Sequence, residues 1–369
     1  MKVAVVGASG FVGGHVLRCL RAEGIDVRAV VRNPRSLPRD TERRVADARD
    51  VYAVRDGIAG CDYVVHSIVG PPDVILGTLA PVYAAAEAMG IRRLVYMSTG
   101  SVHGQTPKPG TDENSALTVR HANPYNTAKV RAERKLRRLR GRGTVELVML
   151  RPTIVFGPGS RWIFDFAAGL LTGTAYVIDG AQGICNSIYV DNLAHAVRMA
   201  LTTPGIDKDV FLVGDEETVT WADLYRPIAS GLGFDFDAVP SFSPPDVPLR
   251  ITKAYVEAIR SSELGQALIA RLPHGLKAAV RTAIRTARSR GVQAPAAPAV
   301  VSGEAGPVPT AEMIALHRCA WRLPNDHARR VLGYRAPVPF AEGCRRSVEW
   351  LEREWLPSRA RREMADGNR

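Results

Sequence analysis

The sequence predicts an α/β fold, with a doubly wound parallel sheet followed by a smaller, mostly helical C-terminal part. Over the first 150 residues, short apolar segments typical of buried strands alternate with helix-like stretches. A glycine-rich turn joins the first of these strands to the first helix, close to the N-terminus. Because parallel strands are connected by right-handed crossovers, we expect helices on both faces of the sheet.

The expected elements follow one another in a regular order. Strands are expected at residues 2–6, 26–31, 44–46, 63–66, 94–97 and 145–150. Helices are expected at residues 11–23 and 74–89. Residues 1–150 are therefore predicted to form one domain built on this sheet, and elements at about 185–215 are candidates for the same sheet.

After residue 150 the alternation loosens, and residues 151–369 are predicted to form a second part that binds the substrate. Helices are expected there at 163–171, 192–201, 221–231 and 326–355, and strands at 175–178 and 210–213. Residues 246–290 carry nine Lys and Arg against three acids, and are predicted to form a basic helical insertion. Residues 294–309 are rich in Ala, Pro and Gly and are expected to be a flexible connector.

The basic helical insertion has more than one interpretation. Its apolar and basic residues each recur at four-residue spacing between residues 276 and 285. This amphipathic pattern suits a surface helix that packs on the protein by its apolar stripe. It also suits peripheral contact with an anionic membrane, or a cover over a cleft that holds an acidic or lipid-like substrate.

Composition narrows the class of protein. The chain has 369 residues, 46% of them hydrophobic, and a formal net charge of +12. It contains no apolar run near the roughly 18 residues of a membrane helix and no signal-peptide pattern, so we expect a cytoplasmic protein. The basic residues are not interleaved with aromatic ones, which argues against nucleic-acid binding. The five cysteines form no C-x-x-C pair, and we expect neither a metal site nor disulfides.

The turn after the first strand has the spacing G-x-x-G-x-x-G, formed by Gly7, Gly10 and Gly13. Gly7 allows a tight turn, Gly10 lets the backbone approach a pyrophosphate, and Gly13 lets the helix lie close to the sheet. The start of the helix offers free N–H groups and a partial positive charge to phosphates. The turn is therefore predicted to bind a dinucleotide through Gly7, Ser9, Gly10, Phe11, Val12 and Gly13.

Tyr125 and Lys129 form a Y-x-x-x-K motif, whose spacing places both side chains on one face of a helix. Asn123 is expected to cap this helix, with Pro124 in its first turn. A free tyrosine has a pKa of about 10, and a lysine ammonium one turn away favours the phenolate. Tyr125 is thus predicted to act as a general acid/base, with Lys129 lowering its pKa.

Four motifs resemble those of the extended short-chain dehydrogenases/reductases, the NAD-dependent epimerase/dehydratase family. They are the glycine turn, Y-x-x-x-K, S-T-G-S-V-H-G at 98–104 and R-P-T-I-V-F-G-P-G at 151–159. The resemblance covers about residues 1–232 and 324–355, and it is nearest to the branch of 3β-hydroxysteroid dehydrogenases and dihydroflavonol reductases. It implies a Rossmann-type fold, a bound nicotinamide dinucleotide, and hydride transfer at a carbon–oxygen group.

The resemblance also assigns site residues. It gives Thr99 the catalytic hydroxyl beside Tyr125 and Lys129, with Ser98 as the alternative. Beyond the glycine turn, it implies cofactor contacts from Arg32, Asp47, Ala48, His66, Ile68, Ser98, Tyr125, Lys129, Pro152 and Val155. The residues expected at the substrate are Thr99, His103, Arg161 and Asn186.

Arg32 bears on which dinucleotide is bound. It stands at the end of the second strand, where NAD-binding members of the family have an acid for the ribose 2′-hydroxyl. Because an arginine can pair with a 2′-phosphate, NADP(H) is favoured over NAD(H). An arginine that is merely solvated, or that stacks on the adenine, is the alternative.

Two departures from the family's patterns and one resemblance to a branch of the family bear on the reaction. Gly100 and Ser101 stand where sugar-nucleotide dehydratases carry Asp and Glu, so dehydration is not expected. Cys185 stands where sugar-nucleotide epimerases usually carry an arginine, which weakens a nucleotide-sugar substrate, although Arg161 could replace that arginine. Asn186, with Y-V-D-N after it, resembles the branch that handles sterols and flavonoid ketones.

We therefore expect an NAD(P)-dependent oxidoreductase that acts on a ketone or secondary alcohol of a small molecule. A nucleotide-sugar epimerase with tightly bound NAD(P) is the alternative, because it would use the same catalytic residues. A non-catalytic cofactor sensor is disfavoured by the intact Thr99, Tyr125 and Lys129. The resemblance also suggests a homodimer.

Overall fold

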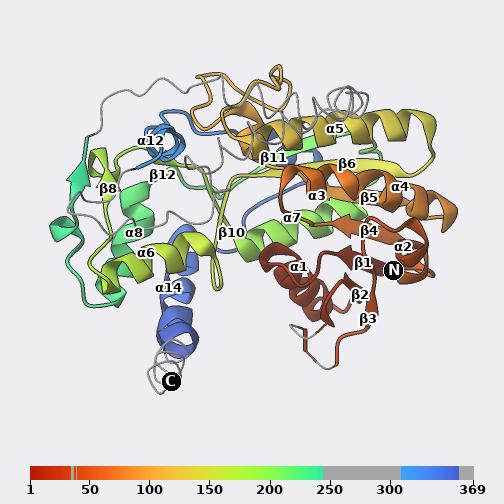
Figure 1. The fold of residues 1–369 in the computed structure, drawn as a ribbon, viewed down its shortest axis with the longest axis horizontal. Helices are drawn as coiled ribbons and strands as arrows, with labels where there is room; N and C mark the ends of the chain where they lie inside the picture. The colour runs from red at the N-terminus through yellow and green to blue at the C-terminus, as the bar shows by residue number, and fades with distance from the viewer. Residues whose placement is uncertain (35–36, 39, 244–308, 357–369) are drawn as a thin grey trace, which may run out of the picture.

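The structure, a computed structural model, describes residues 1–34, 37–38, 40–243 and 309–356. The predicted basic insertion at 246–290 and nearly all of the predicted connector at 294–309 lie outside the described residues. Figure 1 shows one large sheet on the right of the molecule and a group of helices and short strands on the left.

The large sheet has seven parallel strands in the order β11-β6-β5-β4-β1-β2-β3. The predicted α/β fold with a doubly wound parallel sheet is therefore confirmed. The strand β11 lies beside β6 and comes from beyond residue 150. The strands are β1 (Lys2–Val6), β2 (Asp26–Val31), β3 (Arg43–Val45), β4 (Tyr63–His66), β5 (Arg93–Met97), β6 (Glu146–Pro152) and β11 (Val210–Val213).

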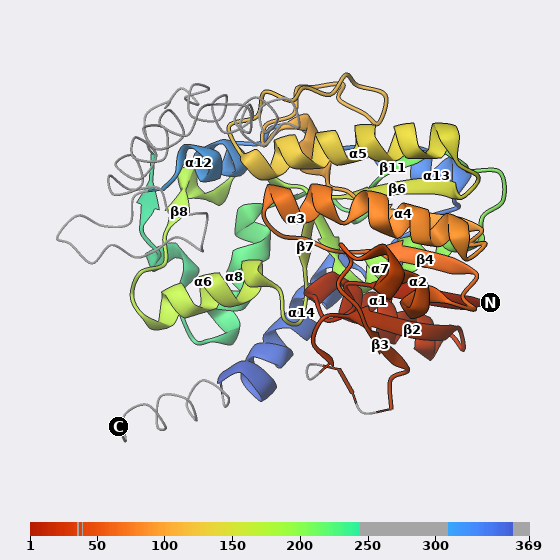
Figure 2. The ribbon, with the colours of Figure 1, turned by 45° about the vertical axis from the view of Figure 1, so that its right-hand side comes forward.

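Helices cover both faces of this sheet, because successive side chains of a strand point to opposite faces. On β1, Val3 and Val5 belong to the core that packs under α1 and α7, whereas Ala4 and Val6 belong to the core under α2, α4 and α5. Figure 2 shows α3, α4 and α5 along one side of the sheet. These helices are α1 (Phe11–Ala22), α2 (Val51–Ile58), α3 (Pro72–Gly77), α4 (Leu79–Ala88), α5 (Pro124–Arg142) and α7 (Val190–Thr202).

The smaller part has its own apolar core, centred on the fully buried Trp221. The ring of Trp221 packs on His317 at 4.2 Å between centroids, and Phe166 stacks on Tyr225 at 4.1 Å. Its helices are α6 (Arg161–Leu171), α8 (Trp221–Gly231), α12 (Ala311–His317) and α14 (Phe340–Trp350), whereas α13 (Asp326–Val331) packs on β11 of the large sheet. Its short strands are β7 (Ile154–Phe156), β8 (Val177–Ile178), β9 (Ile184–Cys185), β10 (Ser187–Tyr189), β12 (Val219–Thr220) and β13 (Ser241–Phe242).

Two predicted helices are broken in the structure. The helix expected at 74–89 divides at Thr78 into α3 and α4, because Pro81 has no N–H to donate to the carbonyl of Gly77. The helix expected at 326–355 divides into α13 and α14, with a π-helical turn at Leu351–Trp355. Gly333, at φ +69°, ends the first of these helices in a left-handed conformation.

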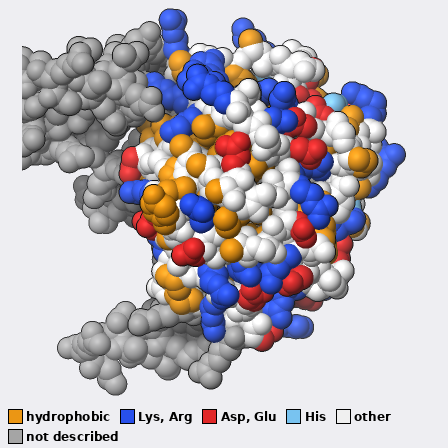
Figure 3. Space-filling view, turned by 90° about the vertical axis from the view of Figure 1, so that its right-hand side faces the viewer, with side chains coloured by type: hydrophobic (Ala, Val, Ile, Leu, Met, Phe, Trp, Pro, Cys, Tyr) orange, Lys and Arg blue, Asp and Glu red, His pale blue; other side chains and the backbone are white. Residues whose placement is uncertain are grey.

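Much of the positive charge on the described surface is paired locally. On the face in Figure 3, Lys and Arg side chains lie in several separate groups with acidic side chains beside them. Lys2 contacts Glu42 at 2.7 Å, Arg92 contacts Asp62 at 2.8 Å, and Arg140 contacts Asp207 at 2.7 Å. In the part of the chain that the structure describes, no helix is both long and apolar enough to cross a membrane.

Candidate active site

The glycine turn between β1 and α1 has the geometry of a phosphate-binding turn. Gly7 has φ +92°, which a side chain rarely adopts. A Cβ at Gly13 would lie 2.4 Å from the Gly7 carbonyl oxygen and 2.6 Å from Ser67 Oγ, so α1 packs this closely because residue 13 is a glycine. The helix begins after Gly10 with no side-chain cap and no acid in its first turn. Its first N–H groups are therefore available to an anion, and the turn fits the pyrophosphate of a dinucleotide.

The other residues predicted at the cofactor follow the carboxyl ends of neighbouring strands. Val6 is in register with Val30 on β2 and with His66 on β4, so these three strands end at the same edge. The backbone of Ile68 lies beside Gly7, whereas Arg32 and Asp47 are exposed beyond β2 and β3. This edge is where open parallel sheets bind their ligands.

His66 and Ala48 are buried, unlike the exposed residues at this edge. The ring Nε2 of His66 hydrogen-bonds with Thr78 Oγ1 at 3.0 Å. Burial, together with the charge of Lys129, lowers the pKa of His66 to about 3. His66 is therefore a neutral, buried side chain that supports the strand end, and its predicted contact with a cofactor remains a prediction.

Tyr125 and Lys129 lie on one face of α5, as the spacing predicts. The predicted cap is confirmed, because Tyr125 donates its backbone N–H to Asn123 Oδ1 at 2.9 Å. Burial raises the pKa of Tyr125 to about 12, and a hydrogen bond with the Thr99 side chain acts in the opposite direction. The Thr99 side chain thus lies close enough to Tyr125 to influence the pKa of its phenol.

Lys129 is buried behind Tyr125. Its Nζ donates to the Met97 carbonyl oxygen at 2.7 Å and to the Tyr96 hydroxyl at 3.4 Å. Burial lowers the pKa of Lys129 to about 7, although the nearby Glu133 carboxylate acts to raise it. The structure differs here from the expected lowering of the Tyr125 pKa by Lys129. The reason is that burial dominates the pKa of each group, while the lysine ammonium lies 5.8 Å from the centre of the tyrosine ring.

The geometry separates the two hydroxyls between which the sequence left a choice. Ser98 is buried and donates its hydroxyl to Glu133 Oε1 at 2.6 Å. Thr99 does not share this contact: its Oγ1 lies 3.0 Å from Ser101 Oγ, and Ser101 donates in turn to Asn126 Oδ1 at 2.9 Å. Because the Ser98 hydroxyl is already donated to Glu133 and Thr99 lies near Tyr125, Thr99 is the better candidate for the hydroxyl that meets a substrate oxygen.

A fully buried ion pair supports this arrangement, and the motifs did not reveal it. The Glu133 and Arg151 side chains are each 1% exposed and are joined by hydrogen bonds of 2.9 and 2.7 Å. Arg151 also donates to the Glu113 carbonyl oxygen at 3.0 Å. The available signal was the position of Glu133, four residues after Lys129 and so on the same buried face of α5.

His103 belongs to this buried cluster. Its Nε2 lies 3.1 Å from Arg151 Nη1, and burial together with the Arg151 charge lowers the pKa of His103 to about 4. An arginine can only donate, so Nε2 of His103 accepts and the ring is neutral. The contacts of His103 in the structure are thus structural, and its predicted contact with a substrate remains a prediction.

The segment after β6 leads from this cluster to the smaller part. Pro152 is buried and Val155 is half-buried, while Arg161 is exposed and lies 3.5 Å from Asp165 on the same helix. The amide of Asn186 donates to the Trp321 carbonyl at 3.1 Å and accepts from the Leu323 N–H at 2.7 Å. Asn186 therefore holds the segment that follows α12, and neither Arg161 nor Asn186 has a described contact with Thr99 or Tyr125.

Comparisons with known proteins identify the family of this chain. The family model described as the NAD dependent epimerase/dehydratase family matches residues 3–214. A 3-diazoavenalumate denitrifying reductase from a Streptomyces species is 31% identical over 219 residues, which cover 54% of this chain and 72% of that protein. A 3-beta-hydroxysteroid dehydrogenase from Mycolicibacterium neoaurum is 28% identical over 262 residues, which cover 63% and 70% of the two chains.

Among solved structures, a UDP-glucose 4-epimerase from Thermus thermophilus in complex with NAD is similar in fold, with a TM-score of 0.65. The match covers 96% of this chain and 100% of that one at 18% identity. Because the family match spans more than half of the sequence, the chain belongs to the NAD dependent epimerase/dehydratase family, within the extended short-chain dehydrogenases/reductases. It is accordingly an NAD-dependent oxidoreductase of that family, which includes dehydrogenases, reductases and epimerases.

Proposed function

We propose that this protein reduces a ketone, or oxidises the corresponding secondary alcohol, of a small molecule. The observation that carries the proposal is the placement of the Thr99 side chain near Tyr125, with Lys129 buried one turn further along α5. Thr99 follows β5, which ends at the same edge of the sheet as β1 and the glycine turn. The nicotinamide dinucleotide, when bound, supplies the hydride donor or acceptor.

The side chains have complementary roles in this proposal. Because burial raises the pKa of Tyr125 to about 12, the phenol holds its proton at neutral pH and is prepared to donate it to a substrate oxygen. The hydroxyl of Thr99 holds the same oxygen, so that the proton has a short path. With a pKa of about 7, Lys129 can carry a proton near neutral pH and oppose the negative charge that develops on Tyr125.

We further propose that the dinucleotide is NADP(H). Arg32 is exposed directly after β2, and its guanidinium is free to meet a 2′-phosphate at this edge of the sheet. Binding of NADPH and NADH to the wild type and to Arg32→Ala tests this choice.

The structure disfavours elimination of water from the substrate. Gly100, where dehydratases have an acid, is buried, and a Cβ there would lie 3.1 Å from Leu323 and 3.3 Å from Thr153. An epimerase stays the second candidate, because oxidation and re-reduction of one carbon would use the same Thr99, Tyr125 and Lys129.

Two measurements distinguish the candidates. Native mass spectrometry of the purified protein shows which dinucleotide is retained, and whether a nucleotide-sugar accompanies it. Absorbance of NADPH with a panel of sterol, flavonoid and other ketones then reports net reduction. The proposal expects NADPH consumption with at least one ketone; retained dinucleotide, turnover of a nucleotide-sugar and no net consumption would instead establish the epimerase.

Association with membranes, a homodimer and a cytoplasmic location stay predictions. The membrane proposal concerns residues 246–290, which lie outside the described residues. Co-sedimentation with vesicles of neutral and of anionic lipid tests it, since binding through a basic helix requires the anionic lipid. Equal recovery with both kinds of vesicle would contradict the proposal.

A further inference from the structure

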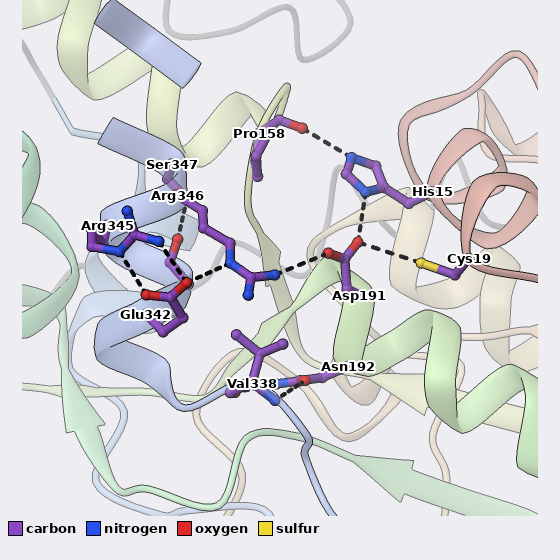
Figure 4. Close-up of polar contacts among 11 residues, drawn as sticks. His15, Cys19, Pro158, Asp191, Asn192, Val338, Glu342, Arg345, Arg346 and Ser347 are labelled. Atoms are coloured by element: carbon purple, nitrogen blue, oxygen red, sulfur yellow. Dashed lines mark hydrogen bonds and ion pairs between the residues drawn. The ribbon is translucent and has the colours of Figure 1, made fainter. Parts of the chain in front are cut away.

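His15 connects three separate segments of the chain. It lies on α1, five residues after Gly10, and is 7% exposed. Its Nδ1 lies 2.9 Å from Asp191 Oδ1 on α7, and its Nε2 lies 3.1 Å from the carbonyl oxygen of Pro158. Figure 4 shows the ring between these two partners.

The two partners orient the ring of His15. A backbone carbonyl can only accept, so Nε2 of His15 must carry a hydrogen. Asp191 is the partner of Nδ1, on the other side of the ring. Burial acts to raise the pKa of Asp191, but hydrogen bonding and charge from His15 outweigh it and hold that pKa below its ordinary value. The contact with Pro158 thus places a hydrogen on Nε2 and fixes the orientation of the ring.

Asp191 has further partners besides His15. It receives the thiol of Cys19 at 3.6 Å and lies 3.9 Å from Arg346 on α14. Burial raises the pKa of Cys19 to about 12, so its thiol stays protonated and can donate. Arg346 in turn donates to Glu342 at 2.7 Å, and Figure 4 shows this row of charged side chains leading to α14.

Pro158 lies in the turn after β7, within the motif at 151–159. Gly157 and Gly159 flank it with φ values of +138° and +87°. Phe11, the first residue of α1, packs edge-on against the His15 ring at 5.2 Å, and a Cβ at Gly159 would lie 3.7 Å from the Phe11 ring. The first turn of α1 and the turn at 157–159 thus meet around one side chain.

We infer that His15 is a positioning residue that couples the phosphate-binding helix to the turn at 157–159. The inference rests on the proposed function, because the turn leads from the predicted cofactor site to the substrate-binding part. A dinucleotide that orders the start of α1 would then also order this turn through His15.

The first test measures the protons directly. Long-range ¹H–¹⁵N correlation spectra of protein labelled at histidine report whether each ring nitrogen carries a hydrogen, and His15→Gln assigns the signal. We expect Nε2 of His15 to carry a hydrogen, as its contact with the Pro158 carbonyl requires. A signal in which Nε2 carries no hydrogen would overturn the inference even if every variant proved unstable.

The second test measures the coupling by hydrogen exchange of residues 157–164, where the Ser160 N–H is bonded to the Gly157 carbonyl at 2.9 Å. His15→Phe keeps a flat ring but removes both hydrogen bonds, and we expect exchange there to become about tenfold faster. We also expect NADPH to protect this segment in the wild type but not in the variant. His327→Phe is the matched control, because His327 also lies near a carboxylate, Asp209 at 3.8 Å, and against a phenyl ring.

The outcomes separate this inference from the proposed function. If the wild type does not bind NADPH, the proposed function fails, while the protonation of His15 and the exchange of the free protein still test the positioning role. If NADPH binds and exchange of 157–164 is the same in His15→Phe as in the wild type, the inference is wrong and the proposed function is unaffected.

Discussion

Removal of the Glu133 carboxylate should destabilise the protein strongly, because Arg151 would be left charged and buried. Arg151 gives two of its described hydrogen bonds to Glu133, and both side chains are 1% exposed. Breaking a buried ion pair at one partner costs about 3–5 kcal/mol. The hydroxyl of Ser98 would also lose its acceptor, at a cost of about 1 kcal/mol or more. Glu133→Leu should therefore lose about 4 kcal/mol or more, against a total stability of roughly 5–15 kcal/mol for a typical protein.

The assay is urea unfolding of Glu133→Leu, of Arg151→Met and of the double variant. Because the double variant has no uncompensated charge, it should be more stable than Glu133→Leu alone, although it has one more substitution. Asp165→Asn is the control, since it breaks the partly exposed pair of Arg161 and Asp165 and should cost only about 0.5 kcal/mol. A loss below about 1 kcal/mol in Glu133→Leu, or a double variant that is less stable than both single variants, would refute the reasoning.

Three further predictions concern pH, the lysine and the cofactor. Burial lowers the pKa of His66 to about 3 and that of His317 to about 4. As the pH drops from about 6.5 to 4, the unfolded chain therefore binds these two protons while the folded protein does not. The free energy of unfolding falls over this range by up to about 1.4 kcal/mol per pH unit per histidine. His317→Phe should flatten that slope in urea titrations, and an unchanged slope would contradict it. Tyr96→Phe removes an acceptor of the Lys129 ammonium and should lower the pKa of Lys129, so the lysine-dependent limb of the pH–rate profile should move about half a unit or more to lower pH. Tyr83→Phe, at an equally buried tyrosine that does not contact Lys129, should leave this limb in place. Arg32→Ala should weaken NADPH binding about tenfold or more while changing NADH binding little, as measured by fluorescence titration; equal losses would argue against a 2′-phosphate contact.

The parts of this protein that depend on local pattern could be predicted from the sequence. The period of the apolar residues gave the strands of the sheet, and the positions of Gly7 and Gly13 gave the turn because the backbone there excludes a side chain. Asn123 was identified as a cap because its role depends on residues within two positions. The breaks at Thr78 and Gly333 depended on a proline and on one left-handed residue within otherwise helical patterns, which the pattern of apolar residues does not report.

What the sequence did not reveal depends on contacts between distant segments. Glu133 and Arg151 are 18 residues apart, and His15 and Asp191 are 176 apart, so no spacing rule brings them together. The pKa of Tyr125 depends in the same way on burial by distant segments, and that burial raises the pKa that Lys129 was expected to lower. Motifs thus located the reacting groups, whereas the electrostatic environment required the packed structure.

The central claim is that Tyr125 gives or takes the proton of a hydride-transfer reaction. The direct measurement is NADPH consumption with an active ketone by the wild type and by Tyr125→Phe, with NADPH binding to both measured in parallel. The account predicts that Tyr125→Phe loses at least about a hundredfold in kcat and still binds NADPH. A Tyr125→Phe variant that turns over at the wild-type rate would contradict it.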